Sequence, residues 1–149
     1  MMMEQRTNRL LSELLINLFT NVMDAEAKAV ITEEFKDITN NDLHIMEAIG
    51  IEEPRKMSDI ARKLNVTAGT LTTNINSLED KGYIVRERST QDKRVVWVIL
   101  TEKGRKAFFH HRDYHKRMIR TIVKDLKEDE KEVLIRCLRT LNHFLEQDC

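Results

Sequence analysis

Residues 57–104, MSDIARKLNVTAGTLTTNINSLEDKGYIVRERSTQDKRVVWVILTEKG, determine the fold expected for this chain. In their first part, apolar residues recur at the i, i+3, i+4 and i+7 spacing of one helix face. These residues are Met57, Ile60, Ala61 and Leu64. Ser58 and Asp59 are suited to cap the start of this helix. Asn65 is expected to end it, because Asn tolerates the left-handed conformation that a tight turn between helices needs.

A second helix follows, with Thr67 as its expected N-cap and Lys81-Gly82 as its end. Leu71, Ile75 and Leu78 form its apolar stripe. Its other face carries short hydroxyls and amides, where an ordinary solvated face would carry Glu and Lys with their higher helix propensity. Short polar side chains can reach base edges and thymine methyls in the major groove of DNA, so we predict a recognition helix. The predicted contacts are Thr67, Gly69, Thr70, Thr72, Thr73, Asn74 and Asn76.

Two β-branched and aromatic runs, 83–88 and 95–100, predict a β-hairpin with the polar tip 89–94. Such a wing can place a cation over the minor groove or along phosphates, and Arg94 is the best candidate. We expect Asp92 to orient the tip as a hydrogen-bond acceptor, since a carboxylate facing phosphate would repel it. A surface ion pair between Arg94 and Asp92 is the alternative. The predicted wing contacts are Arg88, Gln91, Asp92, Lys93 and Arg94.

Helices are also expected on both sides of this region. We predict them over about residues 4–30, 41–49 and 101–126, with a last one opened by Lys127 or Glu128. Thr39 or Asn40 should cap the second of these helices, Gly50 should end it, and Thr101 should cap the third. The terminal helices hold more apolar surface than one winged domain covers, which predicts a homodimer. A two-fold dimer would read a pseudo-palindromic operator with half-sites about 10 base pairs apart.

Three motifs carry a resemblance to a known family. LEDKGYI at 78–84, DKR at 92–94 and LTEKG at 100–104 resemble, in order and spacing, those of the MarR family of bacterial transcription regulators. The resemblance implies a mainly α fold with a small β-hairpin wing (α+β), a winged helix-turn-helix that dimerises through long terminal helices. It also implies one MarR-type domain over 1–149, with dimerisation helices in 1–35 and 105–149 around a DNA-binding core at 39–104.

Within this family the chain looks most like the FabT group of fatty-acid-synthesis repressors. The segments that carry this likeness are 35–38, 43–44, 66–73, 82–84 and 140–146. The resemblance implies repression of type II fatty-acid synthesis genes, with long-chain acyl groups on acyl carrier protein as corepressor. The acyl chain would enter between the first helix and the helix after the wing, near Leu15, Phe19, Met23, Phe108 and Phe109. Each of these five is equally a candidate for dimer core.

The formal net charge of zero conceals a strong segregation of charge. Residues 1–54 carry 4 basic and 11 acidic side chains (net −7), residues 55–117 carry 15 and 7 (net +8), and residues 118–149 carry 6 and 7 (net −1). The positive third contains the predicted winged helix. Because phosphate neutralisation needs local cations, a neutral chain with this pattern is a credible DNA binder whose affinity falls with salt.

Other classes of function find little support in the sequence. Enzyme signatures such as G-x-S-x-G, a P-loop or a Gly-rich dinucleotide turn are missing, and no cofactor is predicted. No apolar run reaches membrane-spanning length, and no signal peptide begins the chain, so we expect a cytoplasmic protein. Cys137 and Cys149 are expected as free thiols. A protein-binding adaptor is the remaining alternative, against which the Thr/Asn helix face and Arg94 favour DNA.

Zinc is the rival to an acyl effector. His111 and His115 are four residues apart on one expected helix, and His44 and Glu47 share a face of another. Imidazoles suit zinc, and some MarR-like regulators bind zinc with His and Glu from comparable places. No H-E-x-x-H motif or Cys cluster reinforces the histidines, so no metal site is predicted. A zinc-responsive regulator, or one that responds to another small ligand, stays open as an alternative.

Overall fold

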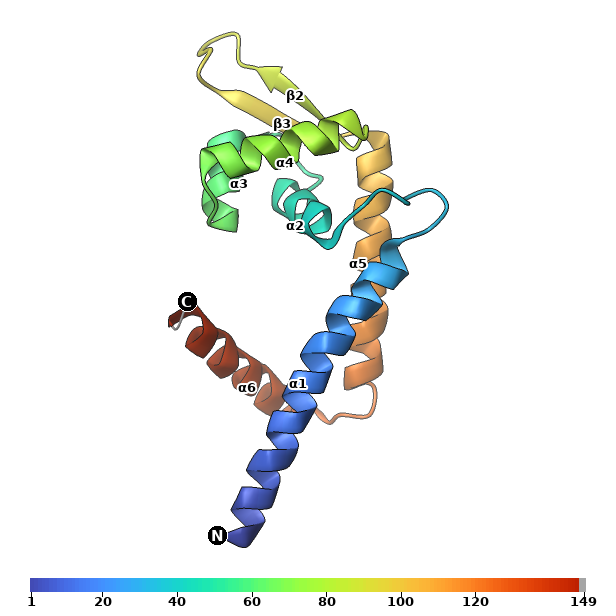
Figure 1. Cartoon of the computed structure of the whole chain (residues 1–149), viewed down its shortest axis with the longest axis vertical. Coiled ribbons are helices and arrows are strands. Elements are labelled where there is room, and N and C mark those ends of the chain that lie inside the picture. Colours follow the sequence, from blue (N-terminus) through green and yellow to red (C-terminus); the bar gives the residue numbers. More distant parts are fainter. Residues whose placement is uncertain (148–149) are drawn as a thin grey trace. The chain divides into compact units, whose positions relative to one another are not determined.

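The computed structural model describes residues 1–147, which form six helices and three strands (Figure 1). The helices are α1 (Met2–Val30), α2 (Asn40–Ile49), α3 (Met57–Leu64), α4 (Ala68–Asp80), α5 (Glu102–Val123) and α6 (Glu128–Gln147). The strands are β1 (Arg55–Lys56), β2 (Ile84–Arg88) and β3 (Val96–Leu100). Two compact units divide within α5, after Arg112. The chain is thus mainly helical with a small sheet, which confirms the predicted winged helix-turn-helix.

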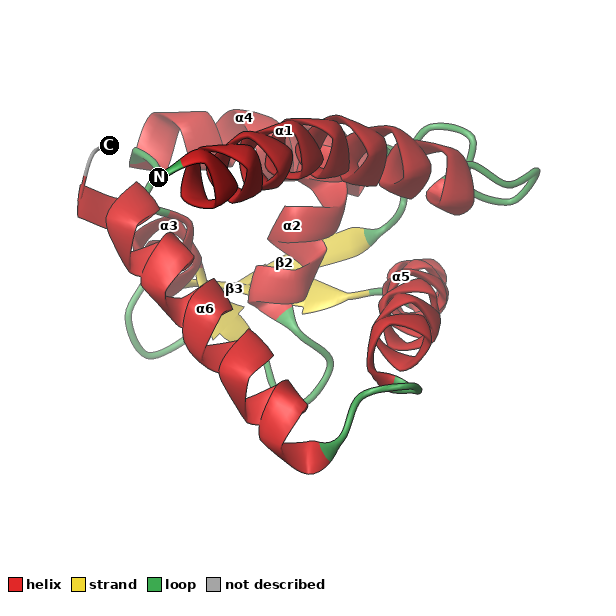
Figure 2. Ribbon diagram, turned by 90° about the horizontal axis from the view of Figure 1, so that it is seen from below, coloured by secondary structure: helices red, strands yellow, loops and turns green. Residues whose placement is uncertain are grey.

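The first unit is built around one apolar core under the sheet. Helix α3 contacts α2 and α4, while α2 lies against β3 (Figure 2). The predicted stripe of α4 supplies three fully buried side chains, Leu71, Ile75 and Leu78. Ile60 of α3 and Val98 of β3 are buried in the same core. Each such side chain contributes about 1.5–3 kcal/mol by leaving water, so this core holds the three helices in place.

The sheet has the order β1-β3-β2 with antiparallel pairing throughout. In the wing, Ile84 lies opposite Leu100 and Arg88 opposite Val96, as the predicted hairpin requires. Strand β1 was not predicted, because two residues are too few to show a strand's alternation. It pairs with the middle of β3, which ties the start of α3 to the wing.

The start of α3 differs from the prediction. Its N-cap is Lys56, which makes no side-chain capping bond, so Ser58 and Asp59 lie inside the first turn. The cause is the pairing of Lys56 with Trp97, which holds Lys56 extended and lets the helix begin directly at Met57.

Two helix ends follow the predicted turn chemistry. Asn65 has a left-handed φ of 53°, and the Val66 amide donates to the Ala61 carbonyl at 3.0 Å. At the end of α4, Gly82 has a φ of 82°, and the Tyr83 amide donates to the Leu78 carbonyl at 3.0 Å. Both are Schellman-type ends, in which a left-handed residue lets the chain satisfy the last helical carbonyls.

The junction between the wing and α5 explains the LTEKG motif. The Thr101 hydroxyl donates to the Gly82 carbonyl at 2.6 Å and accepts from the Gly104 amide at 3.1 Å. Thr101 therefore caps α5, as predicted, and fixes its start to the end of α4. A Cβ at Gly104 would collide with the Tyr83 carbonyl oxygen, so only glycine allows α5 to approach this closely.

The other helix boundaries agree with the prediction to within a few residues. Thr39 caps α2 in a reciprocal box with Asp42, and α2 ends before Gly50. Helix α5 ends at Val123 rather than near residue 126. The Lys127 amide donates to Glu130 at 2.7 Å, which caps the start of α6.

Two helices expose much apolar surface within this single chain. On α1 the exposed apolar residues include Leu10, Leu11, Leu14, Leu15, Ile16, Leu18, Phe19 and Met23. On α6 they are Val133, Ile135, Leu138, Phe144 and Leu145. Cys137 is a free, exposed thiol, whereas Cys149 lies outside the described residues. Over residues 1–147, no helix is long and apolar enough to cross a membrane.

Candidate nucleic-acid interface

The face of α4 away from the core presents the predicted hydroxyls and amides. Thr67 caps the helix by accepting from the Thr70 amide at 3.2 Å, and its hydroxyl donates to the Thr70 hydroxyl at 2.9 Å. Asn74 is half-buried. The exposed members of the predicted set are Thr67, Gly69, Thr70, Thr72, Thr73 and Asn76. The core stripe thus turns this polar face to solvent.

The hydroxyls of Thr72 and Thr73 are already engaged as donors. Thr72 donates to the Ala68 carbonyl at 2.8 Å, and Thr73 donates to the Gly69 carbonyl at 3.2 Å. Each oxygen keeps lone pairs that can accept from an adenine or cytosine amino group. Each side chain also carries a methyl group suited to contact thymine. This helix face can therefore accept hydrogen bonds and make apolar contacts in a groove.

Hydrogen bonds within the wing tip set its shape. The Asp92 carboxylate accepts from the Arg94 amide at 3.0 Å, which confirms Asp92 as a local acceptor. Ser89 accepts from the amides of Gln91 and Asp92 at 3.2 and 3.3 Å. The side chains of Gln91, Lys93 and Arg94 are exposed. The tip is thus a short ordered loop that carries two adjacent cations.

An ion pair joins the wing to the recognition helix. Arg86 of β2 donates through Nε and a terminal nitrogen to the two carboxylate oxygens of Glu79 on α4, at 3.1 and 3.0 Å. These hydrogen bonds lower the pKa of Glu79 and raise the pKa of Arg86. Bidentate pairing fixes direction as well as distance, so it orients β2 relative to α4. The sequence analysis gave Arg86 no role. Arg86 and Glu79 are seven residues apart and lie on either side of the turn at Gly82.

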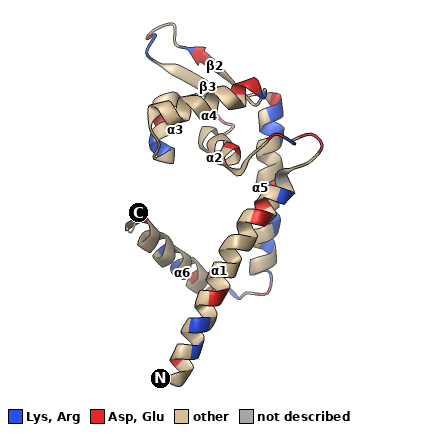
Figure 3. Cartoon of the chain, in the orientation of Figure 1, with Lys and Arg blue, Asp and Glu red and all other residues tan. Residues whose placement is uncertain are grey.

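Positive charge gathers around α3 and the wing. Figure 3 shows Lys and Arg along the wing and on α3, and the exposed members include Arg62, Lys63, Arg88, Lys93 and Arg94. Strand β1 adds two exposed cations, Arg55 and Lys56, that the sequence analysis left out of its DNA contacts. Only the pairing of β1 with β3 shows that they adjoin the wing. Such a concentration of cations favours a polyanion as the partner of this unit.

Comparisons with known proteins agree with this geometry. A sequence model of the MarR family matches residues 38–96. Streptococcus pneumoniae FabT, solved in complex with DNA, is 38% identical, with 95% of this chain and 99% of that chain covered and a TM-score of 0.85. The chain belongs to the MarR family. Other similar proteins are S. aureus MepR in its DNA complex (26% identical, 90% of this chain and 96% of that chain, TM-score 0.71) and Bacillus subtilis PchR (23% identical, 98% of this chain and 94% of that protein).

Membership of the MarR family makes the protein a DNA-binding transcription regulator. It also confirms the expectation that the protein is not an enzyme. The resemblance to FabT drawn from the short motifs holds along nearly the whole chain. The individual DNA contacts on α4 and the wing stay predictions.

The five residues predicted near an acyl chain do not share one environment. Phe108 is buried at 5% exposure and belongs to the core of the winged unit. Leu15, Phe19, Met23 and Phe109 are all more than 40% exposed in the single chain. Four of the five are therefore available to a partner subunit or a ligand, while Phe108 already packs inside the core.

The histidines weighed as zinc ligands differ in their burial. His44 is exposed on α2. His111 is buried, with its Nδ1 at 3.3 Å from a Glu47 carboxylate oxygen and its Nε2 at 3.9 Å from one of Glu26. His115 follows one helical turn after His111 on α5. Glu26, which is 6% exposed, was missed by the sequence analysis, since a lone glutamate on an amphipathic helix gives no signal of burial.

Proposed function

We propose that this regulator represses genes of type II fatty-acid synthesis, with long-chain acyl groups on acyl carrier protein as its corepressor. The observation that carries the proposal is the similarity to S. pneumoniae FabT, which extends over 95% of the chain at 38% identity. An alignment of that extent leaves out only 5% of the chain, so the similarity is not confined to the DNA-reading elements.

In this proposal α4 enters the major groove and the wing follows the neighbouring backbone. The proposed contacts are Thr67, Gly69, Thr70, Thr72, Thr73, Asn74, Asn76, Arg88, Gln91, Asp92, Lys93 and Arg94. Those on α4 read bases through acceptor oxygens and methyl groups. Lys93 and Arg94 supply positive charge, while Asp92 acts through the backbone of the tip.

The regulator acts as a homodimer in the cytosol, and the whole chain works as one MarR-type domain. Support comes from the apolar faces of α1 and α6, which a single chain leaves in water. Residues 1–35 and 105–149 would supply the dimer contacts around the core at 39–104. A symmetric dimer presents two copies of α4 to a pseudo-palindromic operator.

The acyl chain would lie against α1 and α5. Leu15, Phe19, Met23 and Phe109 offer exposed apolar surface to it, whereas Phe108 already packs in the core of the winged unit. Burial stabilises a complex by about 0.8 kcal/mol per CH₂ group, so an acyl chain that buries a few more methylenes in the DNA-bound form than in the free form would tighten DNA binding.

Fluorescence anisotropy tests the proposal directly. A labelled promoter fragment of a fatty-acid synthesis gene is titrated with the regulator at fixed salt. The titration is done with and without acyl carrier protein that is loaded with a long-chain acyl group. Unacylated carrier is the control for its acidic surface. The proposal expects tighter binding only with the acylated carrier. Unchanged affinity with both carriers would contradict it.

A zinc-responsive regulator is the second candidate, and the observation that favours it is buried His111 between two carboxylates. Imidazole and carboxylate are ligands that zinc accepts, so His111 and Glu26 would hold the ion, with His44 and His115 as the further predicted ligands. The same contacts fit a His–carboxylate pair without metal. Zinc and chelator arms of the titration separate the two candidates, because only a zinc regulator changes its DNA affinity between them.

A further inference from the structure

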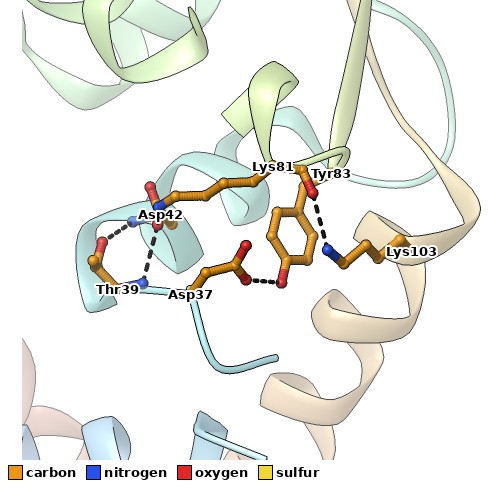
Figure 4. A network of polar contacts seen from close by, with 6 residues as sticks. All are labelled: Asp37, Thr39, Asp42, Lys81, Tyr83 and Lys103. Atoms are coloured by element: carbon orange, nitrogen blue, oxygen red, sulfur yellow. Dashed lines mark hydrogen bonds and ion pairs between the residues drawn. The ribbon is translucent and has the colours of Figure 1, made fainter. Parts of the chain in front are cut away.

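Tyr83 stands where the recognition helix turns into the wing. It follows Gly82 at the end of α4, immediately precedes β2 and is completely buried. Its hydroxyl donates to the Asp37 carboxylate at 2.6 Å, across 46 residues of sequence. The loop between α1 and α2 thereby reaches the base of both DNA-reading elements (Figure 4).

Other polar contacts connect α5 and α2 to the same junction. Lys103 of α5 lies with its ammonium 4.3 Å from the centre of the Tyr83 ring and donates to the Lys81 carbonyl at 2.9 Å. Lys81 in turn pairs with buried Asp42 of α2 at 2.9 Å. Figure 4 shows these side chains converging from α2, the α4 end, α5 and the α1–α2 loop.

The loop that carries Asp37 is itself held firmly. Phe35 and Ile38, on either side of Asp37, are 4% and 6% exposed in the core. The hydrogen bond from Tyr83 lowers the pKa of Asp37, while burial and the nearby carboxylate raise the pKa of Tyr83. At neutral pH an ionised acceptor thus meets a protonated donor, the stronger form of such a bond.

We propose that Asp37 is a positioning residue for operator recognition. Through the Tyr83 hydroxyl it holds the junction of α4 with β2 and so sets the recognition helix relative to the wing. Gly82 forms the turn of this junction, with a left-handed φ of 82°. The proposal rests on DNA binding alone, and not on which genes or effector the regulator serves.

If Asp37 has this role, the discrimination between operator and random DNA should depend on its hydrogen bond with Tyr83. Operator binding needs α4 and the wing in one arrangement, whereas random DNA is bound through phosphates and tolerates several. Loss of the bond should therefore lower the ratio of operator to random-DNA affinity. A residue that served only the stability of the fold would leave that ratio unchanged in the folded protein.

The experiment measures this ratio by anisotropy at fixed salt, with an operator selected by the wild-type protein from random-sequence DNA. The variants are Asp37→Ala, Tyr83→Phe and their combination. Asp37→Asn tests rescue, because its amide oxygen can still accept from Tyr83. Glu34→Ala is the matched control: it removes a carboxylate from the same loop, where Glu34 pairs loosely with Lys106 at 3.8 Å.

We expect Asp37→Ala and Tyr83→Phe each to lower the ratio about tenfold, the size of one hydrogen bond to a charged group. The combination should lose no more than either alone, since both remove the same bond. Asp37→Asn should stay within about threefold of wild type, and Glu34→Ala should leave the ratio unchanged. An unchanged ratio with a lower unfolding midpoint in Asp37→Ala, or an equal loss in Glu34→Ala, would overturn the proposal. Because the operator is selected, failure of the fatty-acid proposal would leave this result intact.

Discussion

At Gly104, α5 approaches the winged core so closely that a larger residue would not fit. A methyl group there would collide with the Tyr83 carbonyl oxygen, and backbone cannot move aside as a flexible side chain can. We expect Gly104→Ala to lower the free energy of unfolding by about 1–3 kcal/mol, as overpacking does. Urea denaturation at fixed protein concentration measures the change.

Gly69→Ala is the matched control for that substitution. Gly69 lies in α4 with no atom within 4 Å of an added Cβ. Alanine there should raise stability by about 0.5–1 kcal/mol through helix propensity. If both variants changed stability in the same direction and by the same amount, the close contact at Gly104 would not be what requires glycine.

We expect Arg94 to contribute to DNA binding and little to the stability of the fold. Its side chain is exposed at the wing tip, and the tip is held by Asp92 through the backbone amide of Arg94, which alanine keeps. We expect Arg94→Ala to weaken operator binding about 5–100-fold while the unfolding midpoint shifts little, since a surface change costs under about 0.5 kcal/mol. Anisotropy and thermal unfolding check the two parts. Unchanged operator affinity would remove Arg94 from the interface.

The recognition helix makes a prediction at the scale of an element. Thr72→Val and Thr73→Val together keep a methyl group at each position and remove the acceptor oxygens. If those oxygens accept from base amino groups, operator affinity should fall about tenfold while random-DNA affinity stays constant. Ser77→Ala, which removes a hydroxyl from the same helix outside the predicted set, is the control. Equal losses on both DNAs would place the threonines on phosphates instead.

The ion pair between Arg86 of β2 and Glu79 of α4 should make the stability of the fold depend on pH. Arg86 lowers the pKa of Glu79 below its ordinary value of 4.5, so the ionised pair stabilises the fold above that value. This contribution is lost as the pH falls through the lowered pKa. The difference in unfolding midpoint between wild type and Glu79→Gln should therefore be full near neutrality and shrink in acid. Glu87→Gln, on the strand that carries Arg86, controls for a simple change of charge.

Helix periodicity and turn chemistry were enough to predict most elements and several of their ends. The stripe of α4, the left-handed Asn65 and the cap at Thr101 all depend on neighbours close in sequence. Strand β1 and the start of α3 depend on pairing with Trp97, about forty residues away, and local patterns cannot show it. Tertiary contacts therefore account for the elements that the prediction missed.

Within the first unit, the same distinction between local sequence patterns and long-range contacts holds for the candidate functional residues. The exposed polar face of α4 followed from the buried stripe behind it, so its residues could be predicted. The bond from Tyr83 to Asp37 and the burial of Glu26 join segments far apart in sequence. Apolar periodicity also could not separate Phe108, which lies in the core, from Phe109, which is exposed.

For the whole molecule, the central claim is a dimer that reads DNA with two copies of α4. Selection of binding sites from random-sequence duplex DNA, followed by sequencing, tests it most directly. The proposed two-fold dimer predicts enrichment of a pseudo-palindrome whose half-sites lie about 10 base pairs apart, or a multiple of that spacing. Enrichment of a single asymmetric half-site, or no enrichment over the starting DNA, would contradict the claim.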